Sequence, residues 1–522
     1  MFLSLCRSLF FYQTQNSNRP RALAPLPGHV SPREILRSET IAWPLQQVLH
    51  LPKNLKTKRK NAMAPKAKKP ITSADLGAVA ASAAAGARQA LAKGDLNGAS
   101  VAMLTLSMAV ANPSMGGAGS GAHVPSSAAA AAVPAAAEVL TAALERAAEH
   151  EASADGGIPP NDDALRAAVE AASISAGCLS ALHFVMNDSA EEEKESGGGV
   201  GGGEEGGGAP SRFEALEPLA ALSRRLLQKI ALELSKRGGG KDGGRKDGAS
   251  KNPWTSKGAL NNAASFAAAL LEGFYGNRVA EEGEELEAAA KDEEREDDDR
   301  SELVVVSPQA LTSILDAAAV CEKQKQESIQ LLSVDLACAV TSSSAGSGEK
   351  LARWGREGEE EGATKSSSGS GCGSGGSAPV VAALARLLGS ISPSSSDFAE
   401  VRIRNLMALA MTLSAELRLD ERKAKKEKEA AASSSSSSSP SAPSPSPPPG
   451  ARARAALVSA PGAPAALVAA MKQSQDADAK AVARGLFEEV ARAEDSKAEM
   501  VAALEKSSGA GVDKGVAELA LA

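Results

Sequence analysis

The chain has few of the residues that build disulfide frameworks and metal sites. Its five cysteines are an odd number, lie far apart and never form a Cys-x-x-Cys pair, so neither a disulfide framework nor a zinc site is indicated. The five histidines are scattered and show no His-x-x-x-His spacing. A reducing compartment is the expected location. The cysteines are Cys6, Cys178, Cys321, Cys338 and Cys372.

Aromatic residues are also scarce. The 522 residues include only 3 Trp, 2 Tyr and 9 Phe, which argues against the large core of a β-sandwich or a Rossmann fold. No segment shows the sustained alternation of β-branched residues that strands require. The sequence therefore predicts an all-α protein.

Motifs for catalysis and cofactor binding are missing as well. There is no Gly-x-x-x-x-Gly-Lys-Ser/Thr loop and no Gly-x-Ser-x-Gly elbow in a credible context. We therefore expect no cofactor, no bound metal and no enzymatic activity. An enzyme with an unrecognised site is the alternative.

The overall charge and hydropathy exclude other classes of partner. The 57 Lys and Arg residues against 64 Asp and Glu give a net charge of −7, so charge supplies no argument for a nucleic-acid partner. No run approaches 18 apolar residues, and we expect no membrane span. The partner should be another protein, and the expected location is the cytoplasm.

The first 62 residues form an irregular or targeting segment. Met1 to Arg37 is rich in apolar and arginine residues with one acid, a composition that suits a mitochondrial or plastid transit peptide. Translation from Met63 is the favoured alternative. Lys53 to Lys69 holds eight basic residues and no acid, so it is either a solvated tail or a nuclear-import signal.

Residues 63–522 read as one helical domain interrupted by polar tracts. Expected disordered loops, rich in Gly, Ser, Pro or acidic residues, occupy 112–133, 188–211, 236–251, 276–301, 341–377 and 420–451. Apolar residues recur at helical spacing between them. The expected helices of the first half are Ser73 to Ala92, Leu96 to Val110, Val133 to Glu149, Ala164 to Met186, Phe213 to Leu234 and Ala259 to Phe274.

One cysteine and one histidine fall in the same expected helix. Cys178 and His183 are five residues apart, and only steps of three or four share a helix face. A catalytic dyad is not expected. We predict that Cys178 belongs to the core and that His183 lies on the helix flank.

The last 215 residues contain a repeat. A helix-initiating proline followed by a pair of helices occurs three times, at Pro308, Pro379 and Pro464. The second and third openings lie 85 residues apart, which fits one unit of about 40 to 47 residues plus the Ser/Pro insertion. This spacing is typical of a helical solenoid.

The clearest copy, Pro461 to Met500, resembles an armadillo repeat, and Pro379 to Leu417 resembles one less closely. The family's pattern is a Gly-Ala-Ile-Pro-x-Leu-Val opening, a polar turn and a long Ala/Leu third helix. The resemblance implies a right-handed armadillo-like α-solenoid. Armadillo repeats that grip extended peptides usually carry an Asn in the third helix. Glu488 and Met411 stand near that place here, which argues against import-receptor-style capture of a basic peptide.

The resemblance implies a non-enzymatic protein-binding scaffold with a preformed helical surface. Arg404 and Arg484 occupy equivalent places in two repeat-like units, so they are candidate groove residues for an acidic or C-terminal ligand segment. Ordinary solvated charges are the alternative. Two other functions stay open: a chaperone-linked adaptor of the Hsp70-exchange or myosin-folding type, by analogy of fold, and a nuclear or RNA-associated protein using the basic segments.

Overall fold

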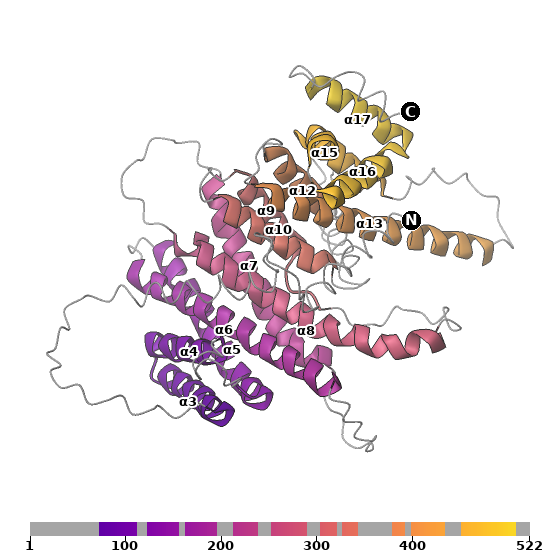
Figure 1. Ribbon diagram of the computed structural model, residues 1–522. Coiled ribbons are helices and arrows are strands. Elements are labelled where there is room, and N and C mark those ends of the chain that lie inside the picture. Colours follow the sequence, from indigo (N-terminus) through magenta and orange to yellow (C-terminus); the bar gives the residue numbers. More distant parts are fainter. Residues whose placement is uncertain are drawn as a thin grey trace, which may run out of the picture. The chain divides into compact units, whose positions relative to one another are not determined.

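The computed structural model confirms the all-α fold. In the part of the chain that it describes there are 14 α-helices and one short 3-10 helix, and no strand (Figure 1). The predicted targeting segment, the basic cluster Lys53 to Lys69 and most of the predicted loops lie outside the described residues. The described ranges are 72–111, 123–155, 162–195, 212–238, 252–289, 303–320, 326–342, 378–391, 398–433, 450–474 and 476–507.

Contacts divide the predicted single domain into two compact units. The N-terminal unit holds α3 to α6, the part of α7 up to Leu226, the 3-10 helix η2 and α8. The C-terminal unit holds α7 from Leu227 onward and helices α9 to α17. We describe each unit by itself.

The helices of the N-terminal unit match the expected ones in number and order. The first pair is joined by a turn in which Gly94 has a φ of 72° and the Asp95 carboxylate accepts a hydrogen bond from the Gly98 N–H at 2.9 Å. The helices are α3 (Ser73–Ala92), α4 (Leu96–Ala111), α5 (Ser126–Asp155), α6 (Asp162–Glu195), α7 (Arg212–Gly238) and α8 (Lys257–Ala289), with η2 at Pro253–Thr255.

A capping box explains why α3 begins at Ser73. The Thr72 hydroxyl accepts from the Asp75 N–H at 3.2 Å, and the Asp75 carboxylate accepts from the Thr72 N–H at 2.9 Å. Two otherwise unsatisfied donors of the first turn are paired in this way. The backbone hydrogen bond from Thr72 is the main reason why the pKa of Asp75 lies below its ordinary value.

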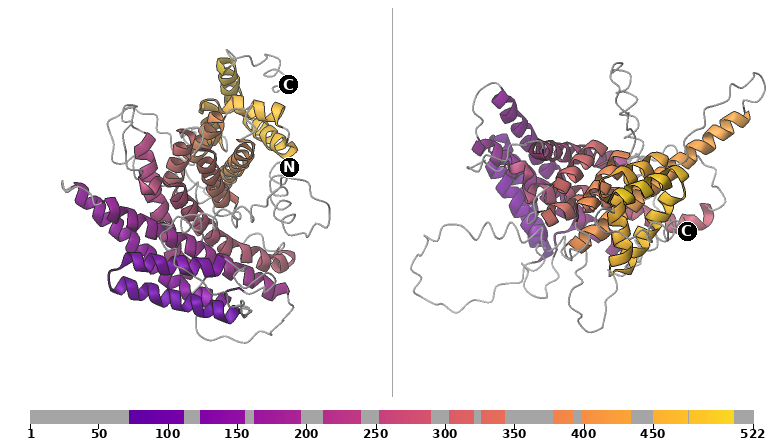
Figure 2. Two further views of the ribbon diagram at one scale, coloured as in Figure 1. Left: turned by 60° about the vertical axis from the view of Figure 1, so that its left-hand side comes forward. Right: turned by 90° about the horizontal axis from the view of Figure 1, so that it is seen from above.

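The core of the N-terminal unit is built largely from alanine and leucine. Helix α6 packs against α4, α5 and α8, and α3 packs against α4 and α5 (Figures 1 and 2). Small residues let these helices approach closely: a Cβ added to Gly177 of α6 would lie 3.1 Å from the amide carbon of Asn262 on α8. The Asn262 amide donates to the Ser173 carbonyl at 3.0 Å and so links the two helices.

Cys178 and His183 of α6 are both buried in the N-terminal unit. Cys178 is fully buried, which confirms its place in the core. His183 is only 4% exposed, so its predicted position on the helix flank is wrong. Helix α6 has buried residues on more than one of its faces, because it packs against α4, α5 and α8.

Several helices run farther than the sequence indicated. Helix α5 starts at Ser126 rather than Val133, because the alanine run has high helix propensity and carries the helix across Pro134. Helices α6, α8 and α13 likewise continue to Glu195, Ala289 and Ser433, into the tracts expected to be loops. Glutamate, lysine and alanine in these tracts are good helix formers even where no core requires a helix.

In the C-terminal unit the three predicted copies correspond to three helix pairs, with α14 between the second and the third. Pairs α9–α10, α12–α13 and α15–α16 each begin at or next to the expected proline. The bounds are α9 (Pro308–Val320), α10 (Gln326–Ser342), α12 (Ala378–Ser390), α13 (Ala399–Ser433), α14 (Ala451–Ser459), α15 (Ala463–Gln473), α16 (Ala477–Ala491) and α17 (Glu494–Ser507).

These pairs stack on one another in sequence order. The first helices contact in the series α9, α12, α15, and the second helices contact in the series α10, α13, α16 (Figure 1). Helices α10 and α13 therefore each have the second helix of the next predicted copy as a neighbour. This arrangement is compatible with a helical repeat.

Two helices of the N-terminal unit are long and apolar enough to cross a membrane, judged by length and composition alone. They are Ser126–Ala152 in α5 and Asp163–Asn187 in α6, and α14 with α15 make a third candidate if their 87° bend is counted as a broken span. Both α5 and α6 pack against other helices of the unit. The expected lack of a membrane span stays a prediction.

Candidate functional site

Arg404 lies at the seam between two stacked copies. It projects from α13, and its guanidinium pairs with Asp335 of α10 and with Glu400 one turn earlier on α13. The Arg404 side chain is only 20% exposed. Its backbone carbonyl also accepts a hydrogen bond from the Cys338 thiol of α10, with the sulfur 3.3 Å away. Arg404 therefore joins α13 to α10 through both its side chain and its backbone.

Electrostatics at this seam favour the charged arginine. Burial lowers the pKa of Arg404, but the charges of Asp335 and Glu400 raise it more, so that its pKa lies above the ordinary value. Burial also raises the pKa of Asp335, a shift that the Arg404 charge opposes. Two carboxylates face one guanidinium, which leaves this place without surplus positive charge for an acidic ligand.

Arg484 has a different environment. It lies on α16, its side chain is 75% exposed, and it pairs only with Glu488 one turn later, at 2.9 Å. An exposed pair of this spacing holds its partners weakly. The two arginines predicted to be equivalent thus lie on neighbouring helices of the same series, but only Arg484 is open to solvent.

A second ion pair joins the first two copies in the same way. Arg386 of α12 donates two hydrogen bonds, each 2.9 Å long, to the carboxylate of Asp316 on α9. The partners lie 70 residues apart, and Arg404 lies 69 residues from Asp335. Both pairs therefore join neighbouring helices of one series across nearly the same separation in sequence, as expected for the predicted copies.

Sequence reasoning identified the arginines but missed their acidic partners. The openings of the first two copies, Pro308 and Pro379, are 71 residues apart. Aligning the copies at these prolines places Asp335 within two residues of the position equivalent to Arg404. That alignment is the signal that could have found the pair.

The surface beside Arg404 on α13 is apolar. Met407 and Met411 follow Arg404 at steps of three and four residues and are half-buried, so they share its helix face. On α16 the exposed side chains Lys480, Arg484 and Glu488 follow one another at steps of four. The series α10, α13, α16 thus presents apolar side chains on one helix and charged side chains on the next.

The third copy contains a buried ion pair. Arg454 of α14 donates to Glu489 of α16 at 3.1 Å, and their side chains are 6% and 10% exposed. Glu489 also accepts from Arg492, whose own side chain is exposed, at 2.7 Å. This pair fastens the short helix α14 to α16 inside the unit, and its burial removes it from contact with a partner.

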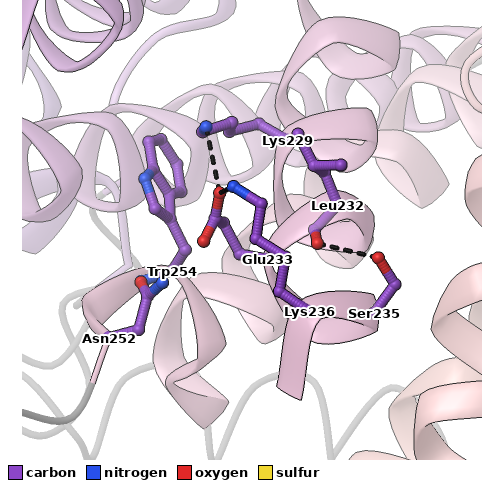
Figure 3. A network of polar contacts seen from close by, with 7 residues as sticks. All are labelled: Lys229, Leu232, Glu233, Ser235, Lys236, Asn252 and Trp254. Carbon is purple, nitrogen blue, oxygen red and sulfur yellow. Dashed lines mark hydrogen bonds and ion pairs between the residues drawn. The ribbon is translucent and has the colours of Figure 1, made fainter. Parts of the chain in front are cut away.

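Helix α7 carries a compact charge cluster within its C-terminal half. Glu233 accepts hydrogen bonds from Lys229 at 3.2 Å and from Lys236 at 2.7 Å, all on the same helix (Figure 3). Burial raises the pKa of Glu233, but the hydrogen bonds and charges of the two lysines lower it more, so that it lies below 4.5. The two lysines thus compensate the charge of a buried carboxylate.

A shallow groove lies between α3 and α4 in the N-terminal unit. Its volume is about 440 Å³, and small side chains of both helices line it, among them Ala78, Ser82, Gly86 and Ala102. Val79 also lines the groove and is 41% exposed. No charged side chain belongs to its lining.

The two cysteines that the structure describes are poor nucleophiles. Burial raises the pKa of the Cys178 thiol to about 12, and burial together with the Asp335 charge raises that of Cys338 to about 12. Thiols of this kind stay protonated at neutral pH. Among the described residues no group of three or more His, Cys, Asp or Glu side chains could hold a metal ion.

Comparisons of the chain with protein-family models, with curated proteins and with solved structures found no match.

Proposed function

We propose that the protein is a non-enzymatic scaffold that binds another protein through an armadillo-like repeat in its C-terminal unit. The observation that carries the proposal is the stacking of three helix pairs in register, with α10, α13 and α16 in one series. Stacked copies make an extended surface that is fixed before a ligand arrives, so little ordering is needed on binding.

The third copy supports the armadillo type in particular. The short helix α14 meets α15 at an angle of 87°, and α16 follows as the longest of the three. Gly462 makes the corner between α14 and α15, with a φ of 78° that suits glycine. A glycine-proline opening at Gly462 and Pro464, a polar turn and a longer Ala/Leu helix after it agree with the family's pattern as given above.

We place the binding face on α13 and α16. A ligand carboxylate at Arg404 must displace Asp335 or Glu400, whereas at Arg484 it displaces only one exposed glutamate. Arg484 is therefore the acceptor site for an acidic ligand segment. Met407 and Met411 on the neighbouring helix supply adaptable apolar contacts, since methionine fits many partner shapes.

Site-specific photo-crosslinking tests this assignment. A photoreactive phenylalanine replaces Met411 on α13, Arg484 on α16 or, as the control, Ser459, which is exposed on α14. The full chain is expressed in its source cells, irradiated and analysed by mass spectrometry. We expect the same partner protein to be linked from Met411 and Arg484 and not from Ser459.

Two results would contradict the proposal. Equal linkage from Ser459 would show that contact with the α13–α16 face is not selective. No linkage from either Met411 or Arg484, in cells where the chain is intact, would remove this face as the binding surface.

A further inference from the structure

Asp335 holds Arg404 in the way that an acid of a ligand would. The Arg404 guanidinium lies on α13, and Asp335 reaches it from α10, the helix that packs beside α13 (Figure 1). Glu400 adds a second carboxylate from the helix turn before Arg404. The side chains of Arg404 and Asp335 are 20% and 33% exposed. Part of the cluster therefore meets solvent, but its one cation already has two carboxylates.

Arg484 has no such partner from a neighbouring helix. Among the described residues its guanidinium pairs only with Glu488 of the same helix, and both side chains are more than half exposed. Helix α13, which packs against α16, contributes Met407 and Met411 to the proposed binding face but no acid that pairs with Arg484. The two arginines thus differ by one carboxylate, that of Asp335.

This difference decides what a ligand gains at each arginine. At Arg404 a ligand carboxylate takes the place of Asp335, whose half-buried carboxylate then loses its hydrogen bond. Such an exchange brings little net free energy, because one charged hydrogen bond replaces another and a partly buried polar group is left without a partner. At Arg484 the displaced Glu488 is exposed, and an exposed pair of this spacing is weak.

We propose that Asp335 is a specificity-determining residue: it closes Arg404 to the ligand and so restricts the α13–α16 face to segments with a single acid, which pairs with Arg484. This inference rests on the proposed function, because it concerns the ligand of the same face. Apolar side chains of the segment contact Met407 and Met411. A second acid is disfavoured, since it would meet the two carboxylates around Arg404.

The distance between packed helices sets the spacing of the ligand's residues. Packed helices lie about 8 to 10 Å apart, and an extended chain advances about 3.3 Å per residue. A segment that crosses from α13 to α16 therefore covers this distance in about three residues. We expect an apolar residue of the ligand over the methionines of α13 and its acid about three positions away, over Arg484.

Peptide selection on the full chain tests the inference. A random peptide library displayed on phage is selected on the natural chain, and enriched peptides are measured by fluorescence anisotropy with and without a second acid. We expect the natural chain to enrich peptides with one acid. Asp335→Asn leaves Arg404 with one exposed glutamate on its own helix, the environment that Arg484 has. This variant should bind two-acid peptides about tenfold more tightly than their one-acid counterparts.

Asp316→Asn is the matched control. It removes the acid that pairs with Arg386 in the other helix series, between α9 and α12, and so frees an arginine away from the proposed face. The control should keep the preference of the natural chain for one acid. Circular dichroism verifies that the variants fold, and Asp335→Ser opens Arg404 in the same way if Asp335→Asn does not fold.

The outcomes separate the inference from the proposed function. A natural chain that prefers two-acid peptides, an Asp335→Asn variant that keeps the preference for one acid, or an Asp316→Asn control that loses it would each overturn the inference alone. If the natural chain enriches no acidic peptide, or if Arg484→Gln binds the enriched peptides as tightly as the natural chain, Arg484 is not the acceptor. That result would overturn the proposed binding face together with the inference.

Discussion

Gly389, at the end of α12, lies against Gly462, the corner residue between α14 and α15. A Cβ added to Gly389 would lie 2.2 Å from the Pro461 carbonyl oxygen, and one added to Gly462 would lie 3.3 Å from the Cα of Gly389. The two backbones thus touch where the second copy meets the third. A Cβ at Gly389 would clash with backbone, and one at Gly462 would crowd the Gly389 backbone at a φ of 78° that favours glycine.

Replacement of Gly389 by alanine should therefore destabilise the C-terminal unit. The new Cβ meets backbone, which cannot rotate away, so we expect a loss of about 1 to 3 kcal/mol in the free energy of unfolding. Chemical denaturation followed by circular dichroism measures it. Gly86→Ala is the control, because a Cβ there meets nothing within 4 Å and should stabilise α3 by about 0.5 to 1 kcal/mol. An unchanged Gly389→Ala protein would contradict the close approach.

The buried pair Arg454–Glu489 should respond differently to single and double replacement. Arg454→Met leaves a buried carboxylate with only Arg492 beside it, and we expect a loss of about 3 kcal/mol. Arg454→Met/Glu489→Leu removes both buried charges and should recover most of that loss. The free energy of unfolding measures both. A double variant less stable than the single one would show that the pair itself stabilises the fold.

The two predicted groove arginines should differ in their coupling energies. A double-mutant cycle of Arg404→Met and Asp335→Asn should give a coupling of about 1.5 kcal/mol, since the pair is hydrogen-bonded and half-buried. The same cycle for Arg484 and Glu488 should give about 0.3 to 0.5 kcal/mol, since both side chains are exposed. Equal couplings would mean that Arg404 is as accessible as Arg484.

Glu233 should make stability depend on pH in the acid range. Its folded pKa lies below 4.5, so the unfolded chain binds its proton more readily and stability rises with pH across this interval. The contribution is present above pH 4.5 and is lost as pH falls through the folded value. Denaturant titrations of the natural chain and of Glu233→Gln should therefore differ at pH 7 and converge at lower pH. A constant difference would exclude titration of Glu233 as the cause.

The thiols of Cys178 and Cys338 should resist alkylation in the folded protein. With pKa values of about 12 they hold little thiolate at pH 8, and Cys178 is also fully buried. Iodoacetamide labelling read out peptide by peptide should modify both only after denaturant is added. Rapid labelling of Cys338 in the native chain would show that the α10–α13 seam opens.

Local sequence determined the helices. The capping residues Thr72 and Asp95, the apolar spacing in α6 and the prolines at 308, 379 and 464 each act within a few residues of the element that they start or stop. The helices expected from Ser73 onward therefore appear in the structure in the expected order. The predicted ends of α5 and α8 were wrong. Good helix formers extend these helices beyond the apolar pattern, because helix propensity acts even where no core packs against the helix.

Only the tertiary structure decided which helix each face meets. The sequence by itself determined an all-α chain, and it predicted three repeat-like helix pairs in which Arg404 and Arg484 occupy equivalent places. The stacking of α13 on α10 made them unlike, because it places Asp335 against the first and leaves the second in solvent. Periodicity shows that a helix has an apolar side. It does not show which helix that side packs against. A side-chain partner about 70 residues away is fixed by packing, which depends on the shapes of both helix surfaces.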